Sequence, residues 1–380
     1  MSTPSEPAVI PISAARTRAG SPHAEPHPAA ASVGTQYDAL RTGALLVDHP
    51  GRDLWTFRGP RSLETITGLI TNDLAGLLPG HGCYAAALTA KGRIIADVRC
   101  FACDPAAGTG WLEGAALVVD VPPRAADGWG ALVRKFVNPR STPYRHEHDR
   151  LRAFGIYGTR ARDAVAEAFG APPSAIAALP PYAHATVSLA DSPVVVARVP
   201  DLGLDGFLVV APTEHRDAAW DRVRTAVPGV VVGGADAYTI ARIEAGYPEW
   251  GVDVDDTTIP QEANLDDLHA ISYTKGCYTG QEVVARIHFR GHVNRHLRGL
   301  VAPPDAPTLS TGAELVDGAG KVVGDVRSTA RSPRLGPIAI AMVRREIDLG
   351  TVLQARGEAG QQEVTVTHLP FPSPLREDPA

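Results

Sequence analysis

The chain has 380 residues, of which 44% are hydrophobic and 21% charged, and its net charge is −6. A soluble globular protein of this length is expected to have two or three domains. The acidic balance argues against broad electrostatic binding of nucleic acid, which requires clustered lysines and arginines. Four cysteines are too few for a disulfide framework, so a reducing cytoplasm is expected. No apolar run is long enough to span a membrane.

The first half of the chain predicts a tail followed by strands and helices. Residues 1–35 lack the apolar block of a secretion signal and predict a disordered tail. A strand is expected at 54–59, and Pro60 suits the start of a helix that runs to Ile70. Two β runs, at 84–88 and 94–103, are joined by a turn that contains Gly92 and predict a hairpin. A strand at 111–121 and a helix at 124–136 follow.

The second half predicts mixed elements and then a β-rich domain. Strands at 151–157, 194–199 and 207–210 alternate with helices at 160–169 and 215–226, and a helix at 237–245 has Asp236 as its expected N-cap. After His296, short β runs separated by turns predict a small antiparallel barrel or sandwich. The fold class is therefore α+β. The expected domains are a body of two interleaved subdomains over 36–290, a β domain over 291–370 and a tail over 371–380.

The segment Lys275–Glu282 reads Lys-Gly-Cys-Tyr-Thr-Gly-Gln-Glu and precedes a helical pattern that contains Val283, Val284 and Ile287. A thiol at a helix N-terminus, with a lysine beside it, has a physical reason to be a thiolate, because both groups favour the anion. Gly276 and Gly280 on either side of Cys277 would allow a sharp turn and close approach of a ligand. The alternative is a glycine-rich turn that carries a buried, inert cysteine.

The wider pattern resembles that of a known family. Pro-Gln-Glu-Ala at 260–263, the cysteine motif and the run from Val283 to Arg295 together resemble the signature of the YgfZ-type family. Members of that family are folate-binding proteins, built like the aminomethyltransferase of the glycine cleavage system, and they support iron–sulfur cluster assembly. The resemblance covers residues from Asp53 to about Leu300. It implies an aminomethyltransferase-like folate-binding body followed by an antiparallel β-barrel.

Three further segments carry the resemblance: Thr-Asn-Asp at 71–73, Tyr84 with Lys-Gly-Arg at 91–93, and Arg-Ile-Glu-Ala-Gly at 242–246. It implies that Glu244 binds the pterin ring of tetrahydrofolate and that Tyr84 packs near it. An arginine such as Arg286 or Arg290 would suit the glutamate tail of the folate. The expected folate contacts are Asn72, Asp73, Tyr84, Arg242, Glu244, Tyr273, Gly276 and Arg286. The residues alone leave simpler alternatives open. Glu244 could be a surface residue, Tyr84 a core residue of a strand, and Asn72-Asp73 a turn that stops a helix.

The acidic residues after the Lys-Gly-Arg turn bear on catalysis. Aminomethyltransferases carry a pair of acids there, whereas this chain has Ala96 and Asp97. Asp97 is the candidate catalytic acid, together with Cys277 and Lys275 as the candidate thiol and its neighbour. A single acid combined with an added cysteine motif argues against aminomethyl transfer.

Two other patterns have spacings that occur in redox or metal sites, but we prefer an ordinary structural interpretation of each. Cys100 and Cys103 have the spacing of a redox pair, but residues three apart on a strand face opposite sides. We interpret them as ordinary strand cysteines. His288, His292 and His296 recur every fourth residue, but Gly291 interrupts the helix between them. A basic surface is the preferred interpretation, and no permanently bound metal is expected.

The leading hypothesis is a folate-binding accessory protein for iron–sulfur cluster assembly or repair, with Cys277 as its reactive thiol. The expected partners are iron–sulfur assembly proteins or client iron–sulfur enzymes, and direct contact with nucleic acid or membrane is not expected. An effect on tRNA modification would be indirect, because the radical enzymes that modify tRNA need such clusters. The alternatives are a folate-dependent aminomethyltransferase or demethylase, and a thiol enzyme acting on electrophiles such as quinones.

Overall fold

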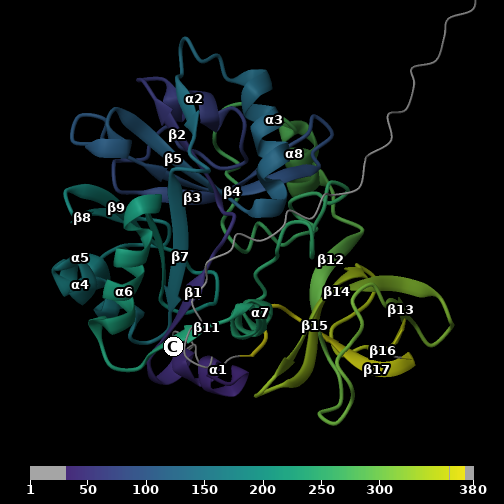
Figure 1. Ribbon diagram of the computed structural model, residues 1–380. Helices are drawn as coiled ribbons and strands as arrows, with labels where there is room; N and C mark the ends of the chain where they lie inside the picture. Colours follow the sequence, from purple (N-terminus) through teal and green to yellow (C-terminus); the bar gives the residue numbers. More distant parts are fainter. Residues whose placement is uncertain (1–30, 359, 373–380) are drawn as a thin grey trace, which may run out of the picture. The chain divides into compact units, whose positions relative to one another are not determined.

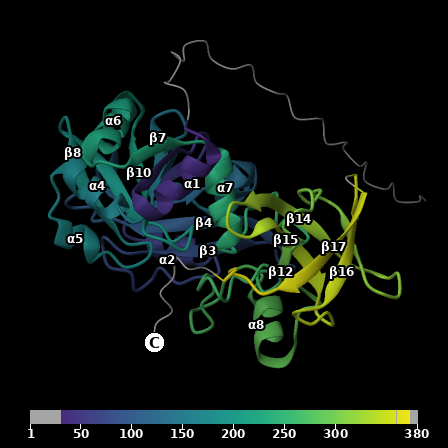
Figure 2. The ribbon, with the colours of Figure 1, turned by 90° about the horizontal axis from the view of Figure 1, so that it is seen from below.

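The computed structural model describes residues 31–358 and 360–372, so the tails predicted at 1–30 and 373–380 lie outside the described residues. Two sheets and a closed barrel, with helices packed against them, make up an α+β fold (Figures 1 and 2). Across the ranges that the structure describes, none of the helices combines the length and the apolar character needed to cross a membrane.

The first sheet has six strands and is covered on one face by three helices. Because strand residues alternate between faces, Phe154 and Ile156 pack against these helices, whereas Ala153 and Tyr157 face the other side. All neighbouring strands are antiparallel except β1 and β11. In spatial order the strands are β11 Val230–Gly233, β1 Ala44–Asp48, β7 Leu151–Tyr157, β10 Gly206–Pro212, β9 Ser192–Arg198 and β8 His184–Leu189. The helices are α4 Ala161–Phe169, α5 Pro173–Ala177 and α6 Arg216–Ala226.

The second sheet has five antiparallel strands. Ala85 and Ala87 face a layer that contains Ile66 and Trp129 from two helices, whereas Tyr84 faces the opposite side. In spatial order the strands are β3 Gly82–Leu88, β4 Ile94–Ala102, β5 Ala115–Val121, β2 Asp53–Arg58 and β6 Tyr144–His146. The covering helices are α2 Ser62–Thr67 and α3 Ala126–Phe136.

The inner faces of the two sheets share one core. Side chains from the second sheet, including Tyr84, and from the first, including Tyr157, belong to the same buried cluster. Two more helices, α1 Val33–Thr42 and α7 Ala235–Glu244, contribute Tyr37, Leu40 and Ile243 to this cluster. Polar side chains placed on these inner faces are therefore brought together from distant parts of the chain.

The C-terminal strands close into a six-stranded barrel with its own apolar interior. It is joined to the body through Glu262, whose carboxylate accepts from Arg295 Nε at 2.9 Å and whose carbonyl accepts from the Leu297 amide at 3.0 Å. Helix α7 also packs against two barrel strands, β14 and β15. The barrel strands are β12 Arg295–Val301, β13 Glu314–Val316, β14 Val322–Ser332, β15 Gly336–Arg344, β16 Val352–Gly357 and β17 Gly360–Thr367.

The structure confirms the α+β class, the hairpin of β3 and β4, and the antiparallel barrel. It corrects two boundaries near the N-terminus. The expected tail over 1–35 ends earlier, because α1 begins at Val33 with the Ser32 side chain as its N-cap. The helix expected to reach Ile70 ends at Thr67, and the Gly68 amide bonds back to the Glu64 carbonyl.

Other differences lie where local geometry outweighs a simple pattern. The strand expected from Trp111 begins at Ala115, because a short 3₁₀ turn over Gly110–Leu112 and Gly114, with φ +66°, interrupt the extended chain. Asp236 is not the N-cap of α7; Gly234 takes that position and Asp236 lies in the first turn. The sequence also did not predict β1, β6, β8 and β11, which are short or lie close to turns.

Candidate functional site

The segment that carries Cys277 is a loop that leads into helix α8, Gln281–Arg290. The Cys277 side chain is exposed, whereas Lys275 and Tyr278 on either side are buried. Cys277 lies four residues before the first helical residue, and Gly280 is the N-cap. The expectation that the thiol sits at the helix N-terminus is therefore wrong, because the N-terminal dipole acts mainly within the first turn.

Lys275 anchors this loop to the end of α2. Its Nζ donates to the backbone oxygens of Thr67 at 2.5 Å, Ile70 at 2.8 Å and Asn72 at 2.6 Å. An ammonium group has three N–H donors, so these carbonyls use its full capacity. Burial lowers the pKa of Lys275 to about 8. We expected Lys275 to activate Cys277, but the structure uses its ammonium group to hold the loop in place.

The cysteine loop lies against the Lys-Gly-Arg turn between β3 and β4. Gly280 has φ +84°, and a Cβ there would lie 2.6 Å from the carbonyl oxygen of Thr89. Gly92 has φ +72°, and a Cβ there would lie 2.8 Å from the Cβ of Val283 on α8. Both positions need glycine, for its backbone freedom and for its lack of a side chain. Gly276 has open space around it and no positive φ, so its predicted role in ligand approach stays a prediction.

Tyr84 and Asp97 meet inside the shared core. The Tyr84 hydroxyl donates to Asp97 Oδ2 at 2.9 Å. The Oδ1 atom of Asp97 is buried and has no hydrogen-bond partner among the described residues. Burial raises the pKa of Asp97, and the Tyr84 hydrogen bond and the charges of Arg52 and Arg99 partly oppose this rise. Asp97 is thus a half-buried residue whose Oδ1 atom is buried and free to accept a hydrogen bond.

Two tyrosines that the sequence did not predict complete this aromatic group. The ring of Tyr182 stacks with that of Tyr84 at 5.9 Å between centroids, and Tyr247 lies 5.4 Å from Tyr84. The Tyr182 and Tyr247 hydroxyls are 2.5 Å apart. We call Tyr84, Tyr182, Tyr247 and Asp97 the tyrosine–aspartate cluster. Tyr247 follows the Arg-Ile-Glu-Ala-Gly segment directly, which is the one sequence signal that could have pointed to it.

An ion-pair chain runs through the same core. Arg99 lies two residues after Asp97 on β4 and donates to Asp120 at 2.9 Å and to Asp201 at 2.6 Å. Asp120 also pairs with Arg52 at 2.5 Å. The two arginines help to hold the pKa of Asp120 below its ordinary value despite burial, which alone would raise it. The sequence placed Arg99 on the right strand but gave no sign of partners that lie 21 and 102 residues away.

Asn72 and Asp73 fit the turn interpretation. Asn72 Nδ2 donates to the carbonyls of Tyr84 at 2.9 Å and His269 at 2.8 Å, and its Oδ1 accepts from the Asp73 amide. Asp73 Oδ1 accepts from the Ala75 amide at 2.9 Å. The donors of the Asn72 amide are therefore used within the protein. These bonds give Asn72 and Asp73 a structural role. The predicted contact of both residues with folate stays a prediction.

Glu244 has partners that the expected pterin contact would displace. Its carboxylate accepts from Tyr37 at 2.9 and 2.8 Å and from Ser332 Oγ at 2.5 Å, and it pairs with Arg334 at 3.5 Å. The residue is only 5% exposed. Two hydroxyl donors and one guanidinium therefore use several of the roughly four acceptor sites of this carboxylate. These bonds give Glu244 a structural role as a link between α1, α7 and barrel strand β14, and its predicted contact with the pterin stays a prediction.

Arg242 is likewise committed to internal contacts. Its Nη1 donates to the Tyr247 carbonyl and to Asp253 Oδ2, both at 2.6 Å. Its Nη2 donates to Ser328 Oγ at 2.7 Å. Asp253 in turn accepts from the Ser328 amide at 3.1 Å, which ties the network to β14. Arg242 therefore stabilises the junction with the barrel, and a free guanidinium for a folate is not present at this position.

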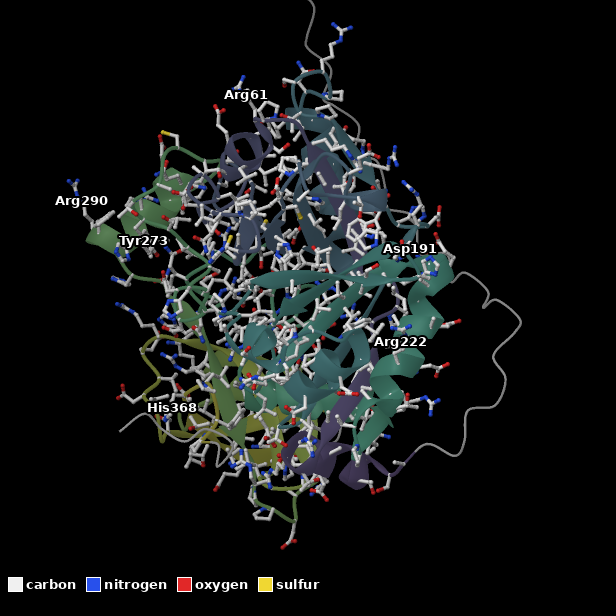
Figure 3. The ribbon with its side chains drawn as sticks, turned by 90° about the vertical axis from the view of Figure 1, so that its left-hand side faces the viewer. Arg61, Asp191, Arg222, Tyr273, Arg290 and His368 are labelled. Carbon is white, nitrogen blue, oxygen red and sulfur yellow. The ribbon has the colours of Figure 1, made fainter. Side chains whose placement is uncertain are left out.

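Tyr273 and Arg286 lie at the cysteine-bearing edge of the body. The Tyr273 ring stacks on His288 of α8, with centroids 3.6 Å apart, and its hydroxyl donates to Asp266 at 2.5 Å. Arg286 is exposed on α8, and Figure 3 shows Arg290 extending from the end of the same helix, with Tyr273 close to it. The structure brings Tyr273 and Arg286 near the Cys277 loop, whereas Tyr84 and Asp97 lie in the core.

The cysteines and histidines of the two weaker patterns lie on different elements. Cys100 lies on β4 and Cys103 directly follows the end of that strand, and the two belong to different apolar layers. His288 ends against Tyr273, His292 is exposed, and α8 stops at Arg290. Within residues 31–358 and 360–372, no cluster of three or more potential metal ligands is found.

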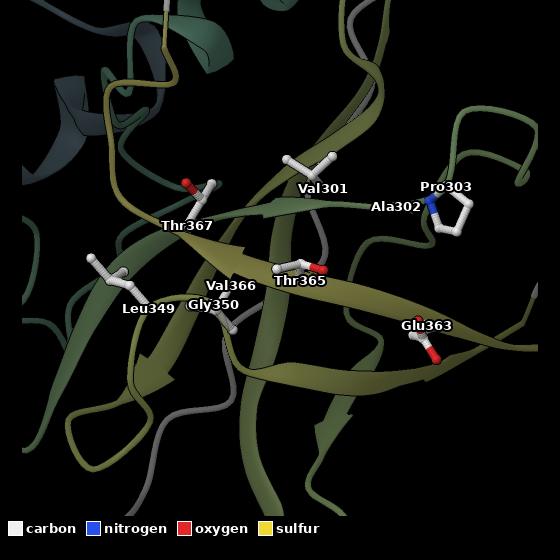
Figure 4. A pocket seen from close by; sticks show the side chains of 9 residues that line it. All are labelled: Val301, Ala302, Pro303, Leu349, Gly350, Glu363, Thr365, Val366 and Thr367. Carbon is white, nitrogen blue, oxygen red and sulfur yellow. The ribbon is translucent and has the colours of Figure 1, made fainter.

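Cavities occur away from the predicted site residues. One, of about 500 Å³, is a groove on the barrel lined by residues of β12, β17 and the 349–350 turn (Figure 4). Leu349 and Thr365 are among the residues that line it. Another, of about 180 Å³, is lined by Cys103 and His184. His184 is buried, and burial lowers its pKa to about 4.

Comparison with known proteins gives two matching family descriptions. The sequence model of the GCVT N-terminal domain matches residues 17–272, and that of the glycine cleavage T-protein C-terminal barrel domain matches residues 295–372. The two matches leave 273–294 between them, which contains the Cys277 loop and α8.

The curated relatives include proteins of two kinds. The chain is 27% identical to the tRNA-modifying protein YgfZ of Yersinia enterocolitica, over 86% of this chain and 91% of the relative. It is 31% identical to the YgfZ protein of Klebsiella pneumoniae, over 64% of this chain and 67% of the relative. An aminomethyltransferase of Nostoc is 26% identical over 89% of this chain and 87% of the relative. Among solved structures, the glycine cleavage system aminomethyltransferase T of Bartonella henselae matches with a TM-score of 0.77 at 22% identity, covering 90% and 89% of the chains. That likeness shows the shared fold.

Proposed function

Because the chain belongs to the glycine cleavage T-protein (GCVT) family, with YgfZ proteins among its relatives, we propose that it is a folate-binding accessory protein for iron–sulfur cluster assembly or repair. The observation that carries this proposal is the exposed Cys277 on a loop fixed at both ends, by Lys275 and by Gly280. We place its action in the cytoplasm, where thiols stay reduced.

The environment of Cys277 supports a role in contact with a partner. Cys100 and Cys103 are buried and Cys83 is half-buried, whereas Cys277 is exposed. A fixed backbone under an exposed thiol keeps the sulfur available without an ordering cost on each encounter. The thiol can then act as a nucleophile or as an iron ligand once it is deprotonated.

The tyrosine–aspartate cluster has the residue types that suit a pterin. Asp97 has an acceptor atom without a partner, and an aspartate can bind the amide and amino groups of such a ring. The rings of Tyr84, Tyr182 and Tyr247 supply apolar faces with polar tips. We infer that these residues, and not Glu244, would hold the ring of a tetrahydrofolate. When bound, the folate would supply a reduced carrier of one-carbon units.

A lone cysteine does not complete a cluster site. Iron–sulfur clusters are generally held by four protein ligands, and the described residues contain no group of three candidate metal ligands. The other ligands would come from an assembly protein or a client iron–sulfur enzyme, with Cys277 as one shared ligand or as a transient nucleophile. Effects on tRNA modification would follow from the supply of clusters to the enzymes that need them.

Two measurements test the proposal. Calorimetry with tetrahydrofolate should show binding by the wild-type chain, at least roughly tenfold weaker binding by Asp97→Asn, and unchanged binding by Cys277→Ser. In cells that lack the protein, the wild type and the buried control Cys103→Ser should restore the activity of iron–sulfur enzymes, whereas Cys277→Ser should not. Full restoration by Cys277→Ser would remove the thiol from the proposal, and absence of folate binding would remove the cofactor.

Two observations favour a second candidate, a folate-dependent aminomethyltransferase or demethylase. Asp97 keeps its position beside Tyr84, and aminomethyltransferases are among the relatives. The neighbouring position is Ala96, so the paired acids of those enzymes are not both present. Folate-dependent turnover of a methylamine substrate, abolished by Asp97→Asn and retained by Cys277→Ser, would favour this candidate over the accessory role.

A further inference from the structure

Two cysteines stand directly opposite each other on neighbouring strands. Cys83 of β3 is the register partner of Cys100 of β4 in their antiparallel pairing. The Cα atoms of such residues lie about 4.5–5.5 Å apart, which falls within the roughly 4.4–6.8 Å that a disulfide spans. Both side chains pack in the same apolar layer, so they point to the same side of the sheet. Both thiols are free in the structure.

The two thiols are not equivalent. Cys83 is half-buried, whereas Cys100 is fully buried. The pKa of the Cys100 thiol is raised well above its ordinary value, first by a hydrogen bond to the Cys83 side chain and then by burial. Since the thiolate is the attacking species, Cys83 is the better first nucleophile and Cys100 the better second one.

A positive charge lies close to both sulfur atoms. The Lys275 ammonium, held by backbone carbonyls at the end of α2, partly opposes the rise in the pKa of Cys100. The same ammonium interacts electrostatically with Cys83. For Cys100 this cation favours the thiolate, which thiol–disulfide exchange requires.

We propose that Cys83 is a site of thiol–disulfide exchange and that Cys100 closes an intrachain disulfide with it. With a low-molecular-weight disulfide such as glutathione disulfide as oxidant, the Cys83 thiolate attacks one sulfur and releases a glutathione thiolate. Cys100 then attacks the Cys83 sulfur of this mixed disulfide, and its proton leaves with the second glutathione. Two protein thiols are oxidised to one disulfide, and one glutathione disulfide is reduced to two glutathione molecules.

The geometry distinguishes this pair from the other cysteines. Cys103 follows the end of β4 and packs in the other apolar layer, with its sulfur 3.8 Å from His184 Nε2. Cys277 lies on the exposed loop before α8. The proposal requires neither folate binding nor a reaction at Cys277, so it can fail without affecting the proposed function. A Cys83–Cys100 disulfide would form beside the lysine that anchors the Cys277 loop.

The test uses the full-length chain carrying Cys277→Ser, so that the exposed thiol does not consume oxidant. The chain is exposed to glutathione disulfide under conditions that fully modify Cys277 in the wild type, and remaining thiols are blocked in denaturant before mass spectrometry. We expect loss of the Cys83 and Cys100 thiols, a peptide crosslink between them and no retained glutathione. Adding Cys100→Ser should trap glutathione on Cys83, and adding Cys103→Ser should change nothing.

Other outcomes would overturn the proposal. The proposal fails if Cys83 and Cys100 both stay free under conditions that fully modify Cys277. It also fails if glutathione remains on Cys83 while Cys100 is intact. A crosslink that contains Cys103 would assign the exchange to a different pair. Circular dichroism of each variant before oxidation checks that the fold is retained, and reversal by a dithiol reductant checks that the product is a disulfide.

Discussion

Gly280 passes so close to Thr89 that a methyl group on Gly280 would lie 2.6 Å from the Thr89 carbonyl oxygen. This approach fits the cysteine loop against the turn between β3 and β4. Gly280 also has φ +84°, a conformation that strains any residue with a side chain.

The two glycines beside Cys277 should therefore respond differently to substitution. We expect Gly280→Ala to lower the free energy of unfolding by about 2–4 kcal/mol, through strain and collision with backbone. Gly276→Ala should change it by less than about 0.5 kcal/mol, because Gly276 is exposed, has open space and has no positive φ. Urea unfolding of both variants measures the difference, and equal effects would contradict this account of the loop.

Lys275 should matter for stability. Replacing it with methionine leaves three carbonyl oxygens, of Thr67, Ile70 and Asn72, without their donor. We expect a loss of about 3 kcal/mol, since each unsatisfied buried acceptor has a cost. The exposed Lys91→Met is the matched control and should unfold like the wild type. A Lys275→Met chain as stable as its control would show that the ammonium does not anchor the loop.

Substitution of Glu244 tests whether its carboxylate stabilises the fold or binds folate. Glu244→Ala removes the acceptor for Tyr37, Ser332 and Arg334, and we expect a loss of about 2–4 kcal/mol in unfolding free energy. Exposed Glu167→Ala on α4 serves as the control. At temperatures where the variant is folded, its affinity for tetrahydrofolate should stay within about twofold of the wild type. A selective loss of folate affinity, without loss of stability, would restore the pterin contact that the structure argues against.

Acid should destabilise the fold partly through His184. Burial lowers the pKa of His184 to about 4 from an ordinary 6.5, so the folded state binds this proton less readily than the unfolded state. The resulting stability is present above pH 6.5 and is lost as the pH falls towards 4, by about 3 kcal/mol at most. His184→Gln should flatten the pH dependence in this window, as measured by urea unfolding at several pH values. The exposed His292→Gln should leave it unchanged.

The local patterns were good guides where neighbours in sequence are also neighbours in space. The β3–β4 hairpin and the barrel strands follow from alternation and turn residues, and α8 follows from its apolar spacing. Glu244 could not be assigned in this way, because its partner Tyr37 is 207 residues away and lies in a helix that the sequence did not predict.

The same limit explains the errors at the cysteine motif. A lysine two residues before a cysteine invites an electrostatic interpretation, but Lys275 binds carbonyls more than 200 residues earlier in the chain. Tyr182 joins the tyrosine–aspartate cluster from a loop with a positive φ, which no periodic pattern marks. Contacts of this kind depend on how the two sheets face each other, and composition and spacing do not contain that information.

The bonds between the body and the barrel have a consequence for how the chain can be divided. Glu262 binds Arg295 and Leu297, Arg242 binds Ser328, and Glu244 binds Ser332. A cut between residues 272 and 295, where the two family matches end and begin, would separate these partners. Buried charges on the body and hydroxyl and amide groups on the barrel would then lack hydrogen-bond partners. The body and the barrel are therefore recognisable as separate units in comparisons, but they are expected to melt together and to be poor candidates for exchange between relatives.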